Sequence, residues 1–164
     1  MSGIGKRAVV ISTVIAAFVG LGLTNATEAS ASTSAGINAA NYAVKNLLNK
    51  PYSEIRQHGT GPTYYDCSGL VQKAFKSGGN RYLPRTTDEQ WRYLRNKGTA
   101  SKTHVHTAQK GDILFFWNNG SVQHVGIYIG SGKMIDANST QGHSKIESAF
   151  YNWGFDYITH GWVK

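Results

Sequence analysis

Apolar residues recur at helical spacing in several segments of the first two thirds of this chain. The earliest predicted helix spans Ile37–Asn49. The next begins at Cys67 and is expected to stop at Gly78-Gly79, because glycine pairs readily end helices. A further helix is expected from Thr86, since Thr86 and Glu89 have the spacing of a capping box. The apolar stripe of the second helix consists of Leu70, Val71, Ala74 and Phe75.

From Asp112 onward the pattern changes to alternation, which is typical of strands. His124–Gly130 is predicted as one strand, with its valine and isoleucines on a single face. Gly130-Ser131-Gly132 is a turn signal, and Lys133–Asn138 is predicted as the returning strand. The meander is expected to end with a strand at 157–163. Helices followed by antiparallel strands predict an α+β domain.

The first 31 residues have the three parts of a secretory signal peptide. Lys6 and Arg7 precede an apolar run, Ala8–Leu23, which is shorter than the roughly 20 residues of a membrane span. The small residues Ala29-Ser30-Ala31 predict cleavage after that triplet, which leaves 32–164 as one domain. No cysteine lies near this point, so we expect a secreted protein without a lipid or other stable membrane anchor.

The formal net charge is +8, and it becomes +7 once Lys6, Arg7 and Glu28 are removed with the signal peptide. Basic residues are spread along the remaining chain. An exported protein of this charge is expected to be attracted to anionic polymers of the cell wall. Nucleic acid is the other partner that such a charge suits. The chain has no nucleic-acid recognition motif, and export separates it from that partner, so none is expected.

Cys67 is the only cysteine, so it has no intramolecular partner for a disulfide in an oxidising compartment. Asp66 stands where an N-cap would, which puts Cys67 in the first turn of a helix. Free N–H groups and the helix dipole there favour a thiolate and stabilise an oxyanion. The sequence therefore predicts a nucleophile, and the alternative is a buried cysteine acting as a small hydrophobe.

A thiolate nucleophile needs a base, and one of the six histidines has a suitable setting. His124 opens a predicted strand, on the face away from the valine and isoleucines and next to Gly126, where little side-chain bulk covers it. The alternative is a half-exposed strand histidine without a task. The others lie in loops, in polar stretches or near the C-terminus: His58, His104, His106, His143 and His160.

The predicted hairpin supplies a third polar group, and its register decides which one. A two-residue turn would pair Gly130 with Lys133 and turn Asp136 away from His124. A three-residue turn would oppose Gly126 to Asp136 and bring Asp136 diagonally next to His124. We favour the three-residue turn, because the glycines can supply its left-handed conformation. Asp136 would then orient the imidazole, with Asn138 as the fallback.

These segments resemble the NlpC/P60 family of cell-wall peptidases. The resemblance covers roughly residues 37 to 163 and implies a papain-like α+β fold with a Cys/His/polar triad. Family members cut the peptide stems of peptidoglycan, most often between γ-D-glutamate and the diamino acid. The blocks that carry it are Asp66-Cys67-Ser68-Gly69-Leu70-Val71, Leu83-Pro84-Arg85-Thr86, Gly111-Asp112-Ile113-Leu114-Phe115-Phe116 and His124-Val125-Gly126-Ile127-Tyr128-Ile129-Gly130.

By position, the resemblance makes Cys67 the nucleophile and His124 the general base. The third, orienting residue falls on Asp136, where the family often has histidine. An aspartate can orient the ring too, and its charge raises the basicity of His124. The resemblance also implies substrate contacts for Tyr52, Asp66 and Ser68, and either a structural or a substrate-facing role for Arg85.

The chain departs from the family after Pro51-Tyr52, where a longer and more charged loop runs through residues 53–62 and is expected to border the site. Trp117 and Trp153 are candidates for the groove or for the core. We expect no metal and no cofactor, because the histidines and the one cysteine lack zinc-ligand spacing. The alternatives to a peptidase are a non-catalytic wall-binding protein and an amidase or acyltransferase on the same fold.

Overall fold

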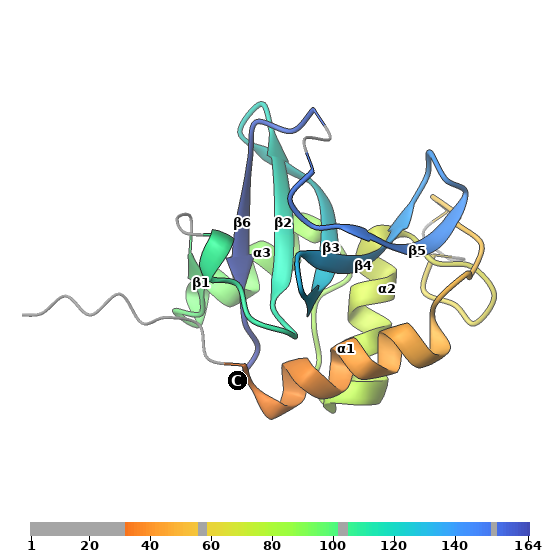
Figure 1. The fold of residues 1–164 in the computed structure, drawn as a ribbon, viewed down its shortest axis with the longest axis horizontal. Helices are drawn as coiled ribbons and strands as arrows, with labels where there is room; N and C mark the ends of the chain where they lie inside the picture. The colour runs from red at the N-terminus through yellow and green to blue at the C-terminus, as the bar shows by residue number, and fades with distance from the viewer. Residues whose placement is uncertain (1–31, 56–58, 102–104, 152–153) are drawn as a thin grey trace, which may run out of the picture.

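The computed structural model describes residues 32–55, 59–101, 105–151 and 154–164. Within these ranges, three α-helices pack on one six-stranded antiparallel sheet with strand order β1-β6-β2-β3-β4-β5 (Figure 1). The predicted α+β class is confirmed, whereas the predicted signal peptide lies outside the described residues. The helices are α1 Ser34–Asn46, α2 Cys67–Ala74 and α3 Thr87–Asn96. The strands are β1 Ala100–Ser101, β2 Ile113–Asn118, β3 Ser121–Gly130, β4 Lys133–Asn138, β5 His143–Ser148 and β6 Tyr157–Gly161.

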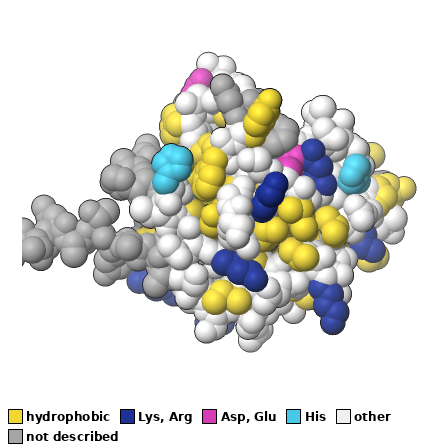
Figure 2. All heavy atoms as spheres, in the orientation of Figure 1, with side chains coloured by type: hydrophobic (Ala, Val, Ile, Leu, Met, Phe, Trp, Pro, Cys, Tyr) yellow, Lys and Arg dark blue, Asp and Glu magenta, His cyan; other side chains and the backbone are white. Residues whose placement is uncertain are grey.

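The surface in the same orientation carries Lys and Arg side chains in separate groups, with hydrophobic side chains between them (Figure 2). On this face the positive charge is therefore distributed, as the sequence predicts. Among the described residues no helix combines the length and the apolar character needed to cross a membrane.

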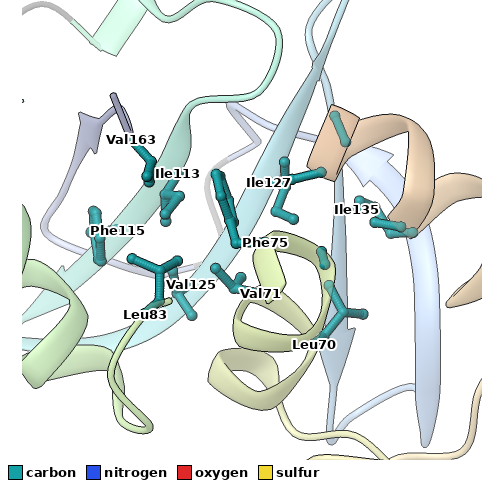
Figure 3. Close-up of a cluster of buried hydrophobic side chains, with 14 of the residues drawn as sticks. Leu70, Val71, Phe75, Leu83, Ile113, Phe115, Val125, Ile127, Ile135 and Val163 are labelled. Atoms are coloured by element: carbon teal, nitrogen blue, oxygen red, sulfur yellow. The ribbon is translucent and has the colours of Figure 1, made fainter. Parts of the chain in front are cut away.

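The core lies between the helices and one face of the sheet (Figure 3). The predicted apolar stripe of the second helix is fully buried there, with Leu70 and Val71 in α2 and Phe75 directly after it. It meets Phe115 of β2 and Ile127 of β3. A second, smaller cluster covers the other sheet face and includes Leu114, Phe116 and Met134. Because both faces are covered, β2 is buried along nearly all its length.

Two of the predicted helix starts are confirmed by their caps. Asp66 caps α2 by accepting a hydrogen bond from the backbone N–H of Gly69 at 2.7 Å. Thr86 caps α3, and Glu89 completes the capping box by accepting from the N–H of Thr86 at 3.0 Å. These caps are local in sequence, and for that reason the pattern of residues alone predicts them.

Both predicted boundaries of the first helix are wrong. The first helix begins at Ser34 instead of Ile37, because Thr33 caps it through the N–H of Gly36, and it ends at Asn46 instead of Asn49. The second helix continues past Ala74 as a π-turn over Phe75–Gly79, and the helical run ends there as predicted, with Asn80 in the left-handed conformation as its cap. A Cβ at Gly78 would overlap α1. Gly78 therefore also serves the close packing of two helices.

Candidate active site

Cys67 is the first residue of α2 and is partly exposed. The segment before the helix is held against its first turn, where the N–H of Asp66 donates to the carbonyl of Gly59 at 3.0 Å. Gly69 permits this contact, because a Cβ there would overlap the same carbonyl oxygen. The sulfur thus lies at the N-terminal end of a buried, well-anchored helix, where backbone N–H groups lack helical partners.

His124 follows an irregularity in β3 that the sequence pattern does not reveal. Phe116 pairs with His124 but Trp117 pairs with Val122, so Gln123 is an extra residue in the strand. Val122 and Val125 consequently both face the core, although they are three residues apart. Bulges often re-aim side chains next to active sites. Here the bulge immediately precedes the histidine.

The β3–β4 hairpin combines features of both registers considered for it. The turn itself has two residues, with Gly130 paired to Lys133, so the predicted three-residue turn is wrong. A bulge at Ile129 then shifts the ladder by one residue, and Ile127 pairs with Ile135. This is the register that the longer turn was expected to give. It places Asp136 on the face of His124, as predicted, because the bulge supplies the extra residue.

His124 and Asp136 form a short hydrogen bond, with 2.6 Å between Nε2 and Oδ2. Asp136 is fully buried, and the side chain of His124 is 15% exposed. Gly126 leaves space for this contact, because a Cβ there would lie 3.2 Å from the Cβ of Asp136. Asn138, the fallback, instead accepts a hydrogen bond from the N–H of Thr140 at 2.9 Å.

The electrostatics of this pair favour a protonated histidine. Burial lowers the pKa of His124, but hydrogen bonds and charge from Asp136 and Cys67 outweigh it and raise the pKa from 6.5 to about 10. Because Nε2 is used by Asp136, the contact with Cys67 falls to the other ring nitrogen. Two aromatic rings fix the imidazole plane: Phe155 stacks on it at 6.4 Å, and Phe116 lies 5.5 Å away.

Cys67 and His124 line one pocket of about 310 Å³. Tyr52 lines it too, as predicted, and burial together with the charges of Cys67 and Glu54 raises the pKa of Tyr52 to about 12. Its hydroxyl thus keeps its proton and can donate a hydrogen bond within the pocket. Asn138, the fallback for the third group, and Glu54, from the loop expected to border the site, line the pocket as well. The other lining residues were not singled out from the sequence: Gln123, Met134, Ala137, Ser139, Thr140, Glu147 and Phe155.

Three predicted substrate contacts form one hydrogen-bonded group at the start of α2. Arg85 donates to Asp66 Oδ1 at 3.0 Å and to the Ser68 hydroxyl at 2.9 Å, and a second nitrogen forms an ion pair with Asp66. They are absent from the residues that line the pocket. The network braces the helix that carries Cys67, and contact with substrate stays a prediction for all three.

The other side chains considered for the site lie elsewhere or outside the described residues. His160 is buried against Asp112, at 2.9 Å. Trp117 is 7% exposed in the core, where its indole N–H donates to Thr159 at 2.9 Å. Of the long loop, Glu54 reaches the pocket. Trp153, His58, His104 and part of that loop, residues 56–58, fall outside the described ranges. Within those ranges no group of three His, Cys, Asp or Glu side chains could hold a metal ion.

Comparison of this chain with known proteins identifies the family to which it belongs. Residues 50–160 match the NlpC/P60 family. The chain is 40% identical over 90 residues to a probable endopeptidase p60 of Listeria seeligeri, covering 55% of this chain and 15% of that protein. Over 113 residues it is 33% identical to the murein DD-endopeptidase MepH of Escherichia coli, which covers 67% and 40% of the two chains.

A bifunctional muramidase/DL-endopeptidase of Bacillus subtilis, CwlT, is 35% identical over 111 residues, or 65% of this chain and 31% of that protein. The chain thus spans less than half the length of these relatives. Among solved structures, NlpC1 from Trichomonas vaginalis superposes with a TM-score of 0.66 at 29% identity. That match covers 80% of this chain and 45% of the other.

Proposed function

Because the chain belongs to the NlpC/P60 family, we propose that it is a cysteine peptidase that hydrolyses peptide stems of bacterial peptidoglycan. The observation that carries the proposal is the 2.6 Å hydrogen bond between His124 and Asp136, in the pocket that Cys67 also lines. A nucleophile, an acid-base group and an orienting carboxylate are the groups that acyl transfer through a thioester requires.

In the first step, the thiolate of Cys67 attacks the carbonyl carbon of the scissile amide. The positive charge of His124 stabilises the thiolate before attack, and its proton passes to the leaving amine. The oxyanion that forms lies at the start of α2, where unpaired backbone N–H groups and the helix dipole stabilise negative charge. The hydroxyl of Tyr52 is a further donor on the pocket wall.

In the second step, water hydrolyses the thioester. Having lost its proton to the amine, His124 takes one from the attacking water and keeps it, so the departing sulfur leaves as a thiolate and the starting pair is restored. Asp136 holds the ring in place through both steps and stabilises its protonated form. The stacked ring of Phe155 restricts rotation of the imidazole.

The bond that we propose is the one between γ-D-glutamate and the diamino acid. The resemblance to the family supports it, and so does the description of the Bacillus subtilis relative as a DL-endopeptidase. The Escherichia coli relative is described as a DD-endopeptidase, so the cross-bridge between stems is the competing bond. We further propose that residues 1–31 direct export and that the mature chain, with a formal charge of +7, is retained by anionic wall polymers.

The proposal is tested by incubating the protein with purified sacculi under reducing conditions, followed by mass spectrometry of the released fragments. Cys67→Ala serves as the matched control, because it removes the sulfur and little else. Fragments that end at γ-D-glutamate, from the wild type only, are the expected result. His124→Ala is expected to abolish release while circular dichroism stays unchanged.

Other products would redirect the assignment. Fragments cut at the cross-bridge would replace the proposed bond with a DD bond. Intact free stems from the wild type only would identify an amidase. Binding of both proteins to the wall without any product would replace catalysis with wall binding.

A further inference from the structure

Asp136 has a second buried neighbour besides His124. Glu147 of β5 pairs in register with Met134, two residues before Asp136 on β4, so Glu147 and Asp136 point to the same face. Glu147 is 8% exposed and stands diagonally across the ladder from Asp136, close enough for Asp136 to raise its pKa. Glu147 also lines the pocket that holds Cys67.

The two carboxyl groups leave buried oxygens without hydrogen-bond donors. Oδ1 of Asp136, the oxygen that His124 does not use, has no hydrogen-bond partner, and neither oxygen of Glu147 has a hydrogen bond of good geometry. Two carboxylates cannot donate to each other, and two adjacent buried negative charges repel strongly. A single proton on one of them removes the repulsion and supplies the missing donor.

The surroundings favour Glu147 as the group that carries this proton. Asp136 already accepts from a protonated His124, which stabilises its ionised form. Burial raises the pKa of Glu147, Lys145 lowers it, and the charge and hydrogen bond of Asp136 raise it further. Lys145 contacts one oxygen, Oε2, which a protonated carboxyl group still offers as an acceptor, so the other oxygen remains available for the proton. The titratable groups that face the pair from the neighbouring elements are Lys145, His124, Cys67, Glu54 and Tyr52.

We propose that Glu147 is a positioning residue, which keeps a proton and donates it in a hydrogen bond to Oδ1 of Asp136. This bond fixes the carboxylate so that Oδ2 points at Nε2 of His124. The inference rests on the proposed function, because it adds a fourth member to the series Cys67, His124 and Asp136. Glu147 acts through Asp136, and the proton stays on Glu147 throughout turnover.

Three substitutions in the full chain test the role. Glu147→Gln keeps a neutral donor of the same shape and is expected to retain kcat within about threefold. Glu147→Leu removes the donor and is expected to lower kcat about tenfold with little change in KM, because a buried acceptor is left unsatisfied. Lys145→Met is expected to cost less than Glu147→Leu. Equal losses in the Lys145 and Glu147→Leu variants would show that the ion pair matters and the proton does not, and would overturn the proposal.

A titration separates this proposal from the proposed function. The midpoint for His124, followed by NMR of its ring nitrogens in the resting protein, is measured without any turnover. Glu147→Gln is expected to leave this midpoint unchanged, because one neutral group replaces another. A lower midpoint would mean that Glu147 is ionised and would overturn the proposal, as would equal kcat losses in the Gln and Leu variants. A wild type that cuts no peptidoglycan would instead refute the peptidase while leaving the titration interpretable.

Discussion

Asp136→Asn is the substitution that most directly tests the site, because it keeps the shape of the side chain and removes its charge. The bond to be weakened is short, 2.6 Å, and its acceptor is fully buried. Hydrogen bonds to charged groups contribute about 1.5–3 kcal/mol. Since about 1.36 kcal/mol corresponds to a tenfold change in rate, kcat is expected to fall about 10-fold to 150-fold. The pKa of His124 is expected to fall below about 10 as well, because part of its rise comes from Asp136.

The assay is steady-state cleavage of a soluble stem peptide, with kcat and KM determined at several pH values. Asn138→Ala is the matched control on the same strand face, and it is expected to cost less because Asn138 bonds to Thr140 and not to the histidine. A loss of kcat below about threefold for Asp136→Asn, together with an unchanged alkaline side of the pH–rate profile, would refute the reasoning. So would a larger loss in the Asn138 variant.

The remaining predictions concern pH and the anchoring of α2. As the pH rises, kcat/KM is expected to fall with a midpoint near pH 10, where His124 loses its proton. A fall with a midpoint near pH 6.5 would contradict this. Because folding raises the pKa of His124, its protonation stabilises the folded protein fully below pH 6.5, and this stabilisation is lost as the pH rises through about 10. Urea unfolding of the wild type and of His124→Gln at several pH values measures this contribution. Arg85→Met is expected to lower the free energy of unfolding by about 1–3 kcal/mol, since it leaves Asp66 without its main partner. Gly69→Ala is expected to lower the free energy of unfolding by about 1–3 kcal/mol and to lower kcat, because the new methyl group displaces Gly59. Unchanged unfolding curves for the Arg85 or the Gly69 variant would contradict the prediction for that variant.

The part of the site that depends on local sequence could be predicted from the sequence. Asp66 caps the helix that presents Cys67, and the bond involved spans three residues. Alternation in the part of β3 that follows His124 separates core residues from site residues, since valine and isoleucine mark the core face, although β3 itself begins earlier than predicted, at Ser121. Both signals are written within a few residues of the group that they position.

The other features of the site depend on bulges in the strands and on the pairing of strands, which local sequence does not reveal. The bulges at Gln123 and Ile129 add residues without any glycine or proline at those positions, so alternation alone does not locate them. The register of the hairpin was predicted for the wrong reason, because a bulge and not a longer turn supplies the shift. Glu147 was missed since the β5 sequence is largely polar and its neighbour Asp136 becomes visible only through strand pairing.

Glu147 gains its significance from Asp136, which stands where the resemblance to the family leads us to expect a histidine. A histidine there can be neutral, whereas Asp136 is a buried negative charge that needs compensation on both oxygens. His124 compensates Oδ2, and the proton of Glu147 is proposed to compensate Oδ1. The effects of the two carboxyl groups should therefore not be additive. In Asp136→Asn the charge is gone, so adding Glu147→Leu is expected to lower kcat by less than about threefold, compared with about tenfold in the wild-type background. A double variant whose loss equals the product of the two single losses would show that Glu147 acts independently of Asp136, through the pocket wall that it also lines.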